Sequence, residues 1–277
     1  MYRTNRNTKI AIISDSKKKN WPLGDYIHIL SFLPNIKFKK LDWYSRNDTF
    51  KIIKEVDFIK NYKNLKKFNE NKYDHVINLF SNLKSTKKTF YINNLFDSKK
   101  NDKENTKNLL RKLAKVYNIR DYQIYFNKKK IIKSKYDLFI CWNTNEEWKI
   151  KRYPYKKYLI IKKYLEKKYN MKIHIQKKTD KLEKYIQNIK VSKIILSVMT
   201  LGIHFSMLFN KHLVALIGPN NYDDLKLYNK VTQILPNKRC KIHSKKLNIK
   251  YSKCSCMRNI DENKIIKTIS KIYEKIS

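Results

Sequence analysis

The sequence predicts an α/β protein with mainly parallel sheets, divided into two domains. Short apolar runs of strand length alternate with helical patterns along the chain, as they do in successive βαβ units. The length of 277 residues leaves room for two modest domains. Hydrophobic residues make up 42% of the chain, which is enough apolar surface to build a core and excludes a disordered basic tail.

The first half contains four expected elements and two stretches that periodicity does not place. We expect strands at 10–14 and 76–80 and helices at 25–33 and 105–117. Pro34 is expected to stop the first of these helices. The stretches 45–75 and 81–104 are too polar to assign.

The second half follows the βαβ pattern more regularly. We expect strands at 138–142, 172–175, 193–198 and 213–217, and helices at 154–169, 181–189, 202–209 and 261–276. Pro154 stands in the first turn of its helix, where its missing N–H costs nothing. Asp261 is the expected N-cap of the closing helix, whose apolar stripe consists of Ile265, Ile266, Ile269 and Ile272. A basic run at 128–130 precedes a new strand, so the predicted domains are 1–132 and 133–277.

The formal net charge of +41 allows two interpretations. One is a basic protein that binds nucleic acid or another anionic surface, because lysines neutralise phosphates. The other is a compositional drift toward A/T-rich codons, since Lys, Asn, Ile and Tyr abound everywhere while only 3 Gly and 5 Pro occur. The lysines are not clustered and no nucleic-acid-binding motif is present, which favours drift and no specific nucleic-acid partner. Either way the charge favours anionic partners such as nucleotides, phosphorylated glycolipids or an anionic membrane face.

The cysteines and the apolar segments point to a cytoplasmic protein. The 4 Cys are unevenly spaced, and no N-terminal stretch has the pattern of a signal peptide. The longest stretch without a charge, 194–210, contains several polar residues and is too short to span a membrane. Cys240, Cys254 and Cys256 with His243 would make an incomplete zinc motif, so no metal site is expected.

Gaps in the distribution of lysine mark three unusual turns. The stretches 20–36, 194–210 and 212–225 contain no Lys or Arg, and they hold Gly24, Gly202 and Gly218. Burial explains part of this pattern. Glycine is also needed where backbone conformation or the close approach of another group forbids a side chain. We therefore expect turns between strands and helices that face a ligand.

Each candidate residue, at these turns and in the cluster at 148–154, has a structural and a functional interpretation. Asp25 is either a helix cap or a general base. His204 is either a packed core residue or part of a diphosphate cradle with the N–H groups of the helix that begins near Gly202. Lys151 is either a solvated lysine or a cation directed at the sheet edge.

The turn at Gly218 and Pro219 ends a strand at the carboxyl edge of a sheet, where α/β proteins bind ligands. As a single turn, however, it favours a structural interpretation.

Taken in order, these pieces resemble the heptosyltransferase family of glycosyltransferases. That family has a Gly-Asp turn and a helix ending in Leu-Pro, as at 24–25 and 33–34, and a Trp-x-x-Lys-x-Trp-Pro element, similar to 148–154 with Tyr153 as the second aromatic residue. It also has an Asp-(Ser/Thr)-x-x-x-His turn, similar to 199–204, and a Gly-Pro-Thr turn, similar to 218–220. A Cys-Met-x-x-Ile element matches 256–260. The chain departs from the family at Met199, in place of Asp, and at Asn220, in place of Thr.

The resemblance implies the two-domain GT-B fold, with two Rossmann-like domains and the active site in the cleft between them. It implies an inverting, metal-independent and cofactor-free transfer of a heptose-like sugar from a nucleotide-diphosphate donor to an anionic glycolipid of the lipopolysaccharide-core type, at the inner membrane face. Asp25 would be the base. The implied donor-binding residues are Lys151, Thr200, Gly202, His204, Gly218 and Pro219. A related protein without catalytic activity is the alternative within this family.

Overall fold

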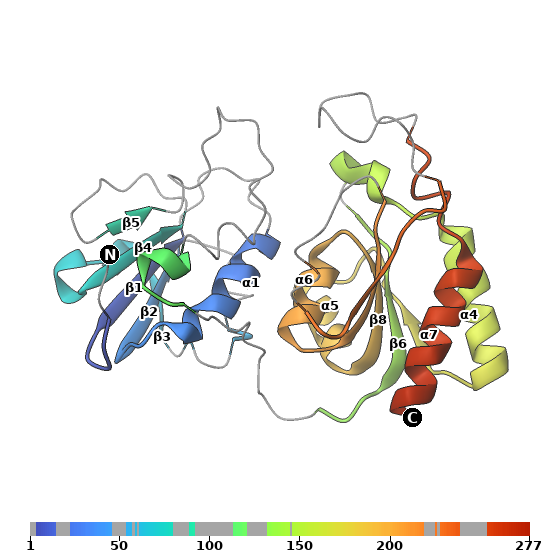
Figure 1. The fold of residues 1–277 in the computed structure, drawn as a ribbon, viewed down its shortest axis with the longest axis horizontal. Helices are drawn as coiled ribbons and strands as arrows, with labels where there is room; N and C mark the ends of the chain where they lie inside the picture. Colours follow the sequence, from blue (N-terminus) through green and yellow to red (C-terminus); the bar gives the residue numbers. More distant parts are fainter. Residues whose placement is uncertain are drawn as a thin grey trace. The chain divides into compact units, whose positions relative to one another are not determined.

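The computed structural model divides the chain into two compact units, Met1–Lys129 and Lys130–Ser277. It describes residues 4–14, 23–45, 54–56, 59, 61–79, 89–91, 113–120, 132–144, 146–218, 225, 228–238 and 254–277. The side chains of 23–26, 28, 90–91 and 146–148 lie outside this description. Each unit is built around its own sheet, as Figure 1 shows.

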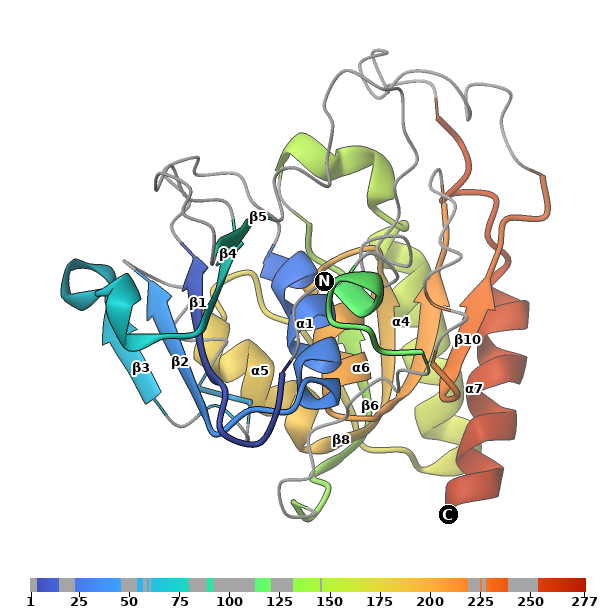
Figure 2. The same cartoon turned by 60° about the vertical axis from the view of Figure 1, so that its left-hand side comes forward.

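The first unit contains a five-stranded sheet in the order β3-β2-β1-β4-β5, with every pair of neighbouring strands parallel. Its strands are β1 (Lys9–Ser14), β2 (Lys40–Ser45), β3 (Asn61–Asn64), β4 (His75–Leu79) and β5 (Thr89–Tyr91). Its helices are α1 (Leu23–Phe32) and the 3-10 turns η1 (Leu33–Asn35), η2 (Leu65–Lys67) and η3 (Glu70–Lys72). Figure 2 shows α1 and these strands from another side.

The predicted strands at 10–14 and 76–80 correspond to β1 and β4, and the helix at 25–33 corresponds to α1. The α-helix ends at Phe32, before Pro34, as expected. A 3-10 turn at Leu33–Asn35, with the proline inside it, follows directly. Of the expected helix at 105–117, the structure describes only the last turn. The strands β2, β3 and β5 were not predicted, because Asp42 interrupts the apolar pattern of β2 and because β3 and β5 have only 4 and 3 residues.

The second unit contains a five-stranded sheet in the order β10-β9-β8-β6-β7, again with parallel neighbours throughout. Its strands are β6 (Tyr136–Cys141), β7 (Ile173–Ile175), β8 (Ser192–Val198), β9 (His212–Leu216) and β10 (Val231–Ile234). Its helices are η5 (Glu146–Lys151), α4 (Tyr155–Tyr169), α5 (Leu182–Lys190), α6 (Leu201–Leu208) and α7 (Glu262–Ile276).

The eight elements predicted for this half are all present within two residues of their expected bounds, and β10 was missed. Pro154 occupies the N-cap of α4 and not its first turn. Asp261 is the N-cap of α7, as predicted, and its carboxylate accepts a hydrogen bond of 2.9 Å from the Asn263 N–H. Ile265, Ile266 and Ile269 of α7 are buried.

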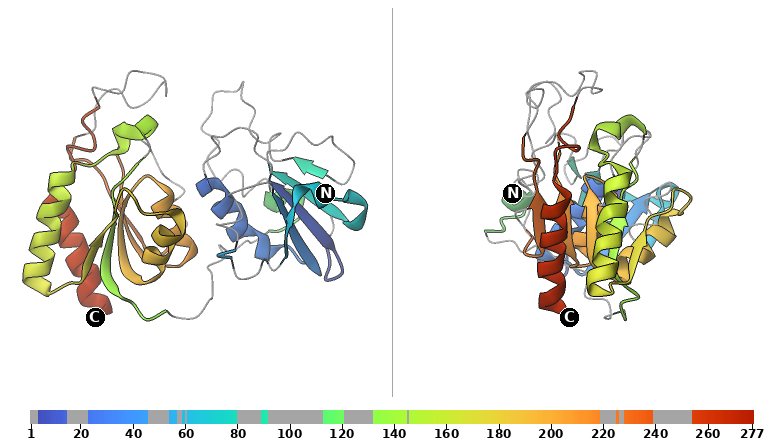
Figure 3. Two further views of the ribbon diagram at one scale, coloured as in Figure 1. Left: turned by 180° about the vertical axis from the view of Figure 1, so that it is seen from behind. Right: turned by 90° about the vertical axis from the view of Figure 1, so that its right-hand side faces the viewer.

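Helices cover both faces of this second sheet. Figures 1 and 3 show α5 and α6 on one face, and α4 and α7 side by side on the other. The core between the sheet and the α4–α7 layer is formed by apolar side chains of the central strands together with Tyr153, Tyr158, Met257 and Ile260. No helix in the described part of the chain is long and apolar enough to cross a membrane.

The first sheet contains a buried carboxylate. Asp42 on β2 is completely buried, and its Oδ2 lies 2.6 Å from the Lys63 ammonium and 2.5 Å from the Tyr73 hydroxyl. The Tyr73 hydroxyl is 2.6 Å from that of Tyr44, and Lys40 is 3.3 Å from the same carboxylate oxygen. Burial opposes ionisation, but the hydrogen bonds from Lys63 and Tyr73 and the two ammonium charges outweigh it, so the pKa of Asp42 is lowered.

Asp42→Ala should lower the free energy of unfolding by about 2 kcal/mol or more, because a buried hydroxyl and an ammonium lose their charged partner. Lys40→Ala is the matched control. Its side chain is 44% exposed, and such a pair contributes roughly 1 kcal/mol or less. Urea unfolding of both variants tests the assignment, and equal losses would show that the buried network does not support the sheet.

Candidate functional site

The topology of the second sheet marks one place where a ligand is expected. The chain runs from β6 outward to β7 and then returns to β8, on the other side of β6. The carboxyl ends of β6 and β8 therefore form a topological switch point, and α/β sheets bind ligands at such points. The connection from β6 to α4 and the turn from β8 to α6 both begin here.

Side-chain contacts shape the connection after β6. The Arg152 guanidinium donates two hydrogen bonds to Thr144, one of 3.0 Å to its hydroxyl and one of 2.9 Å to its carbonyl. The Trp142 indole donates 2.7 Å to the carbonyl of Gln176, beyond β7. The Arg152 contacts join the two ends of η5, and the Trp142 contact joins the start of the connection to the segment after β7. The last residue of η5 is the half-buried Lys151. Sequence reasoning singled out Lys151 but not Arg152, since one arginine among 64 basic residues carries no distinguishing signal.

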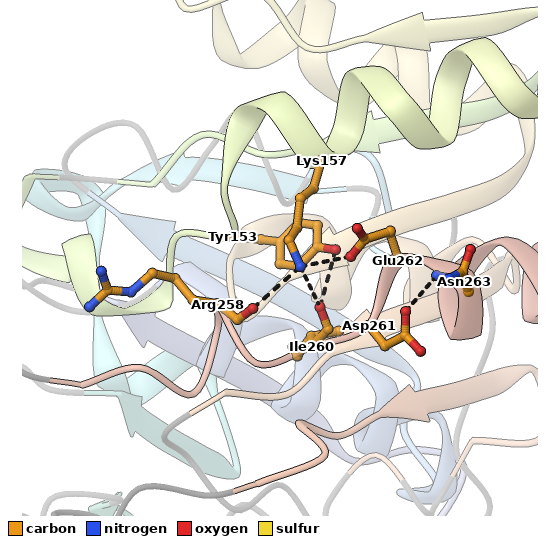
Figure 4. A network of polar contacts seen from close by, with 7 residues as sticks. All are labelled: Tyr153, Lys157, Arg258, Ile260, Asp261, Glu262 and Asn263. Carbon is orange, nitrogen blue, oxygen red and sulfur yellow. Dashed lines mark hydrogen bonds and ion pairs between the residues drawn. The ribbon is translucent and has the colours of Figure 1, made fainter.

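The end of this loop is attached to the start of α7, as Figure 4 shows. The hydroxyl of the buried Tyr153 donates a hydrogen bond of 3.3 Å to the Ile260 carbonyl. Lys157 donates 2.7 Å to Glu262, with which it forms an ion pair, and also reaches the Ile260 carbonyl at 3.3 Å and that of Arg258 at 3.4 Å. The hydrogen bond from Lys157 lowers the pKa of Glu262. Two of the motifs quoted above, 148–154 and 256–260, thus meet in one contact.

The turn after β8 begins α6 without a side-chain cap. Thr200 is the N-cap residue, but its hydroxyl donates 3.3 Å to the Val198 carbonyl and accepts no helix N–H. The Ile203 N–H donates 3.1 Å to the Thr200 carbonyl. The Thr200 side chain therefore leaves the N–H groups of Leu201 and Gly202 uncapped, and the N-terminus of a helix favours anions.

A buried polar cluster supports this turn from below. The Tyr185 hydroxyl of α5 lies beside the Cys141 thiol and the Thr200 hydroxyl. Burial raises the pKa of Cys141 to about 12 and that of Tyr185 well above its usual value, so both are neutral. Neither residue was singled out from the sequence, because α5 and β6 lie far apart along the chain.

The two described glycine turns face side chains of the protein itself. A Cβ at Gly202 would lie 2.5 Å from the Tyr185 hydroxyl, 2.7 Å from the Ser197 hydroxyl and 3.1 Å from the Cys141 Cβ. A Cβ at Gly218 would collide with the Met257 side chain. Both glycines have negative φ, so close approach and not conformation explains them. Close packing thus explains these two glycines without a ligand.

The remaining candidates have different surroundings. His204 lies on α6 with 8% of its surface exposed. Pro219 lies outside the described residues. Asp25 belongs to the first unit, where it is the third residue of α1; its side chain is not described. The structure thus brings the Lys151 loop, Thr200 and Gly202 to one sheet edge. Asp25 stands on the helix that follows β1, at the corresponding switch point between β1 and β4.

Within the described residues, no group of three or more His, Cys, Asp or Glu is arranged to hold a metal ion. Of the zinc alternative, Cys240 and His243 lie outside the description. Cys256 is buried beside Met257, and Cys254 is partly exposed.

Comparison with solved structures identifies the fold. The E. coli ADP-heptose lipopolysaccharide heptosyltransferase II superposes with a TM-score of 0.66 at 13% identity, over 96% of this chain and 99% of that one. E. coli heptosyltransferase WaaC with ADP gives a TM-score of 0.61 at 13% identity, over 95% and 99%. The iron-containing dodecameric glycosyltransferase TibC from enterotoxigenic E. coli gives 0.62 at 9% identity, over 100% and 78%.

No protein-family model and no curated protein matches the sequence. The structural likeness nevertheless covers nearly the whole chain and both units. The chain therefore has the fold of the heptosyltransferases, the family that its motifs resemble.

Gly202→Ala tests the close packing at the start of α6. Alanine in a helix normally gains about 1 kcal/mol over glycine. Here overpacking against Tyr185 should cost about 1–3 kcal/mol, so we expect a lower melting temperature. Tyr185→Phe removes the nearest atom. Adding Gly202→Ala to the Tyr185→Phe variant should therefore lower the melting temperature less than adding it to the wild type. A higher melting temperature for Gly202→Ala would contradict the packing described.

Proposed function

We propose that this protein is an inverting, metal-independent glycosyltransferase that takes a heptose-like sugar from a nucleotide-diphosphate donor. The observation that carries the proposal is the uncapped start of α6 beside the Lys151 connection, at the switch point of a sheet in the heptosyltransferase fold. Among the solved structures with this fold, WaaC is described with bound ADP. The proposed domains are 1–132 on the acceptor side and 133–277 on the donor side.

The donor diphosphate would bind at the start of α6. The N–H groups of the first turn, which include that of Gly202, donate to phosphate oxygens, and the N-terminal end of the helix dipole favours their charge. Lys151 supplies a cation from the neighbouring connection. Thr200, His204 and the turn at Gly218 and Pro219 complete the proposed donor site.

The chemistry requires a base for the acceptor hydroxyl and stabilisation of the departing diphosphate. Asp25 is the proposed base, removing the proton while the acceptor oxygen attacks the anomeric carbon from the face opposite the diphosphate. Lys151 and the N–H groups of α6 neutralise the charge that develops as the bond to the sugar breaks. No covalent intermediate forms, so the configuration at the anomeric carbon is inverted.

The proposed acceptor is an anionic glycolipid of the lipopolysaccharide-core type. A formal net charge of +41 attracts a phosphorylated glycolipid and an anionic membrane face. We therefore propose a cytoplasmic protein that contacts the inner membrane face peripherally.

Asp25→Asn separates catalysis from binding. Asn retains the size of Asp but cannot accept the proton. If Asp25 is the base, the transfer rate from ADP-heptose should fall about a hundredfold or more while the affinity for ADP persists. The rate is measured with a core glycolipid as acceptor, and ADP binding is measured as a shift in melting temperature. Unchanged turnover would remove Asp25 from the mechanism.

Lys151→Ala should instead weaken ADP binding, because its ammonium would meet a diphosphate that is already charged in the ground state. Lys149→Ala is the matched control: it lies in the same 3-10 helix but is exposed. Calorimetric titration with ADP should show an affinity loss of about tenfold for Lys151→Ala and little for Lys149→Ala. Equal losses of ADP affinity in the two variants would show that only the net charge matters and not the position of Lys151.

A further inference from the structure

One face of α4 exposes large apolar side chains to solvent. Leu159 is 44% exposed and Ile160 52%, and the neighbouring Tyr155 and Tyr164 are 44% and 43% exposed. The opposite face of the helix buries Tyr158, Ile161 and Leu165 in the core. The exposed residues therefore are not needed to attach α4 to the sheet.

The same face carries exposed lysines and a single acid, whose side chain is 38% exposed. Its exposed cations are Lys156, Lys163, Lys167 and Lys168. Glu166 is the only acid of α4 and is ion-paired with Lys162 at 2.6 Å.

The adjacent helix α7 extends this charge. It exposes Lys264, Lys267, Lys271 and Lys275. Its exposed Glu274 accepts a hydrogen bond of 3.0 Å from the Tyr169 hydroxyl of α4. Figure 3 shows α4 and α7 side by side on the outer layer of the second unit. We call their exposed residues the α4–α7 surface.

We infer that the α4–α7 surface docks on an anionic lipid bilayer. Lysines beside a membrane are attracted to anionic headgroups, and their stems extend along apolar surface. Leu159 and Ile160 would enter the boundary between headgroups and acyl chains, and tyrosine suits that same depth. The surface thus combines electrostatic attraction to anionic lipids with burial of apolar side chains, the two contributions on which peripheral helices depend.

Charge complementarity favours a lipid surface over the other occupants. A second copy would bring lysines against lysines across the interface, which is repulsive. A nucleic acid would neutralise the lysines but would leave two aliphatic side chains against a polar phosphate backbone. The assignment does not rest on transferase activity, since docking needs neither donor nor acceptor.

Vesicle co-sedimentation of the full chain tests the inference. The vesicles are phosphatidylcholine with about one third phosphatidylglycerol, or phosphatidylcholine alone. The wild-type chain should bind the anionic vesicles and release them at high salt. Lys163→Glu with Lys167→Glu, and separately Leu159→Ser with Ile160→Ser, should each weaken the partition about tenfold or more.

Two matched controls separate this surface from the general charge and hydrophobicity of the chain. Lys181→Glu with Lys184→Glu changes the charge equally at exposed residues on the other face of the sheet. Ile132→Ser with Leu235→Ser removes two other apolar side chains, which are 41% and 36% exposed. Both controls should retain vesicle binding, and melting curves verify that all four variants fold.

Three results would overturn the inference. The first is an equal loss of vesicle binding by the surface and control variants, and the second is undiminished vesicle binding by both surface variants. The third is surface variants that lose binding to RNA in the same assay while they keep binding to vesicles. A failure here would leave ADP binding and sugar transfer untouched, so it is distinguishable from a failure of the proposed function.

Discussion

Two parallel sheets, each covered by helices or loops, impose the constraint on which the rest of this structure depends. Strands buried on both faces exclude charge, yet the chain carries 64 basic residues. The central strands β8 and β9 are accordingly almost free of lysine, and the cations lie on connections and on the outer faces of helices. At the carboxyl end of β6 the cations Lys149, Lys151 and Arg152 likewise lie on the connection and not on the strand.

This constraint also explains which elements the sequence predicts. In the second half, apolar strands bounded by lysines mark their own ends, and Pro154 and Asp261 mark the starts of α4 and α7. In the first half, β2 escapes prediction because Asp42 interrupts its apolar pattern. That carboxylate is tolerated only because Lys63 and Tyr73 approach it from a different strand and loop. No local pattern contains such a contact.

In the candidate site, too, the sequence predicts the positions of residues along the fold but not the contacts between residues that are distant in sequence. The positions of Lys151, Thr200 and Gly202 at one sheet edge follow from the order of strands and helices, which periodicity indicates. The contacts that shape the edge join residues distant in sequence, such as Tyr185 with Cys141 and Tyr153 with Ile260. The glycines were expected to face a ligand, and at Gly202 and Gly218 they face protein side chains. Lysine gaps thus report close packing as readily as binding.

The attachment of Tyr153 and Lys157 to the start of α7 has a consequence for biosynthesis. Domains generally fold as units while the chain is being made, with earlier segments available first. The connection that carries Lys151 leaves the ribosome about a hundred residues before Ile260, at roughly 5–20 residues per second. For several seconds the strands of the second sheet can pair while this connection lacks its partner. The sheet edge beside the Lys151 connection would be the last part of the unit to take its final shape during translation.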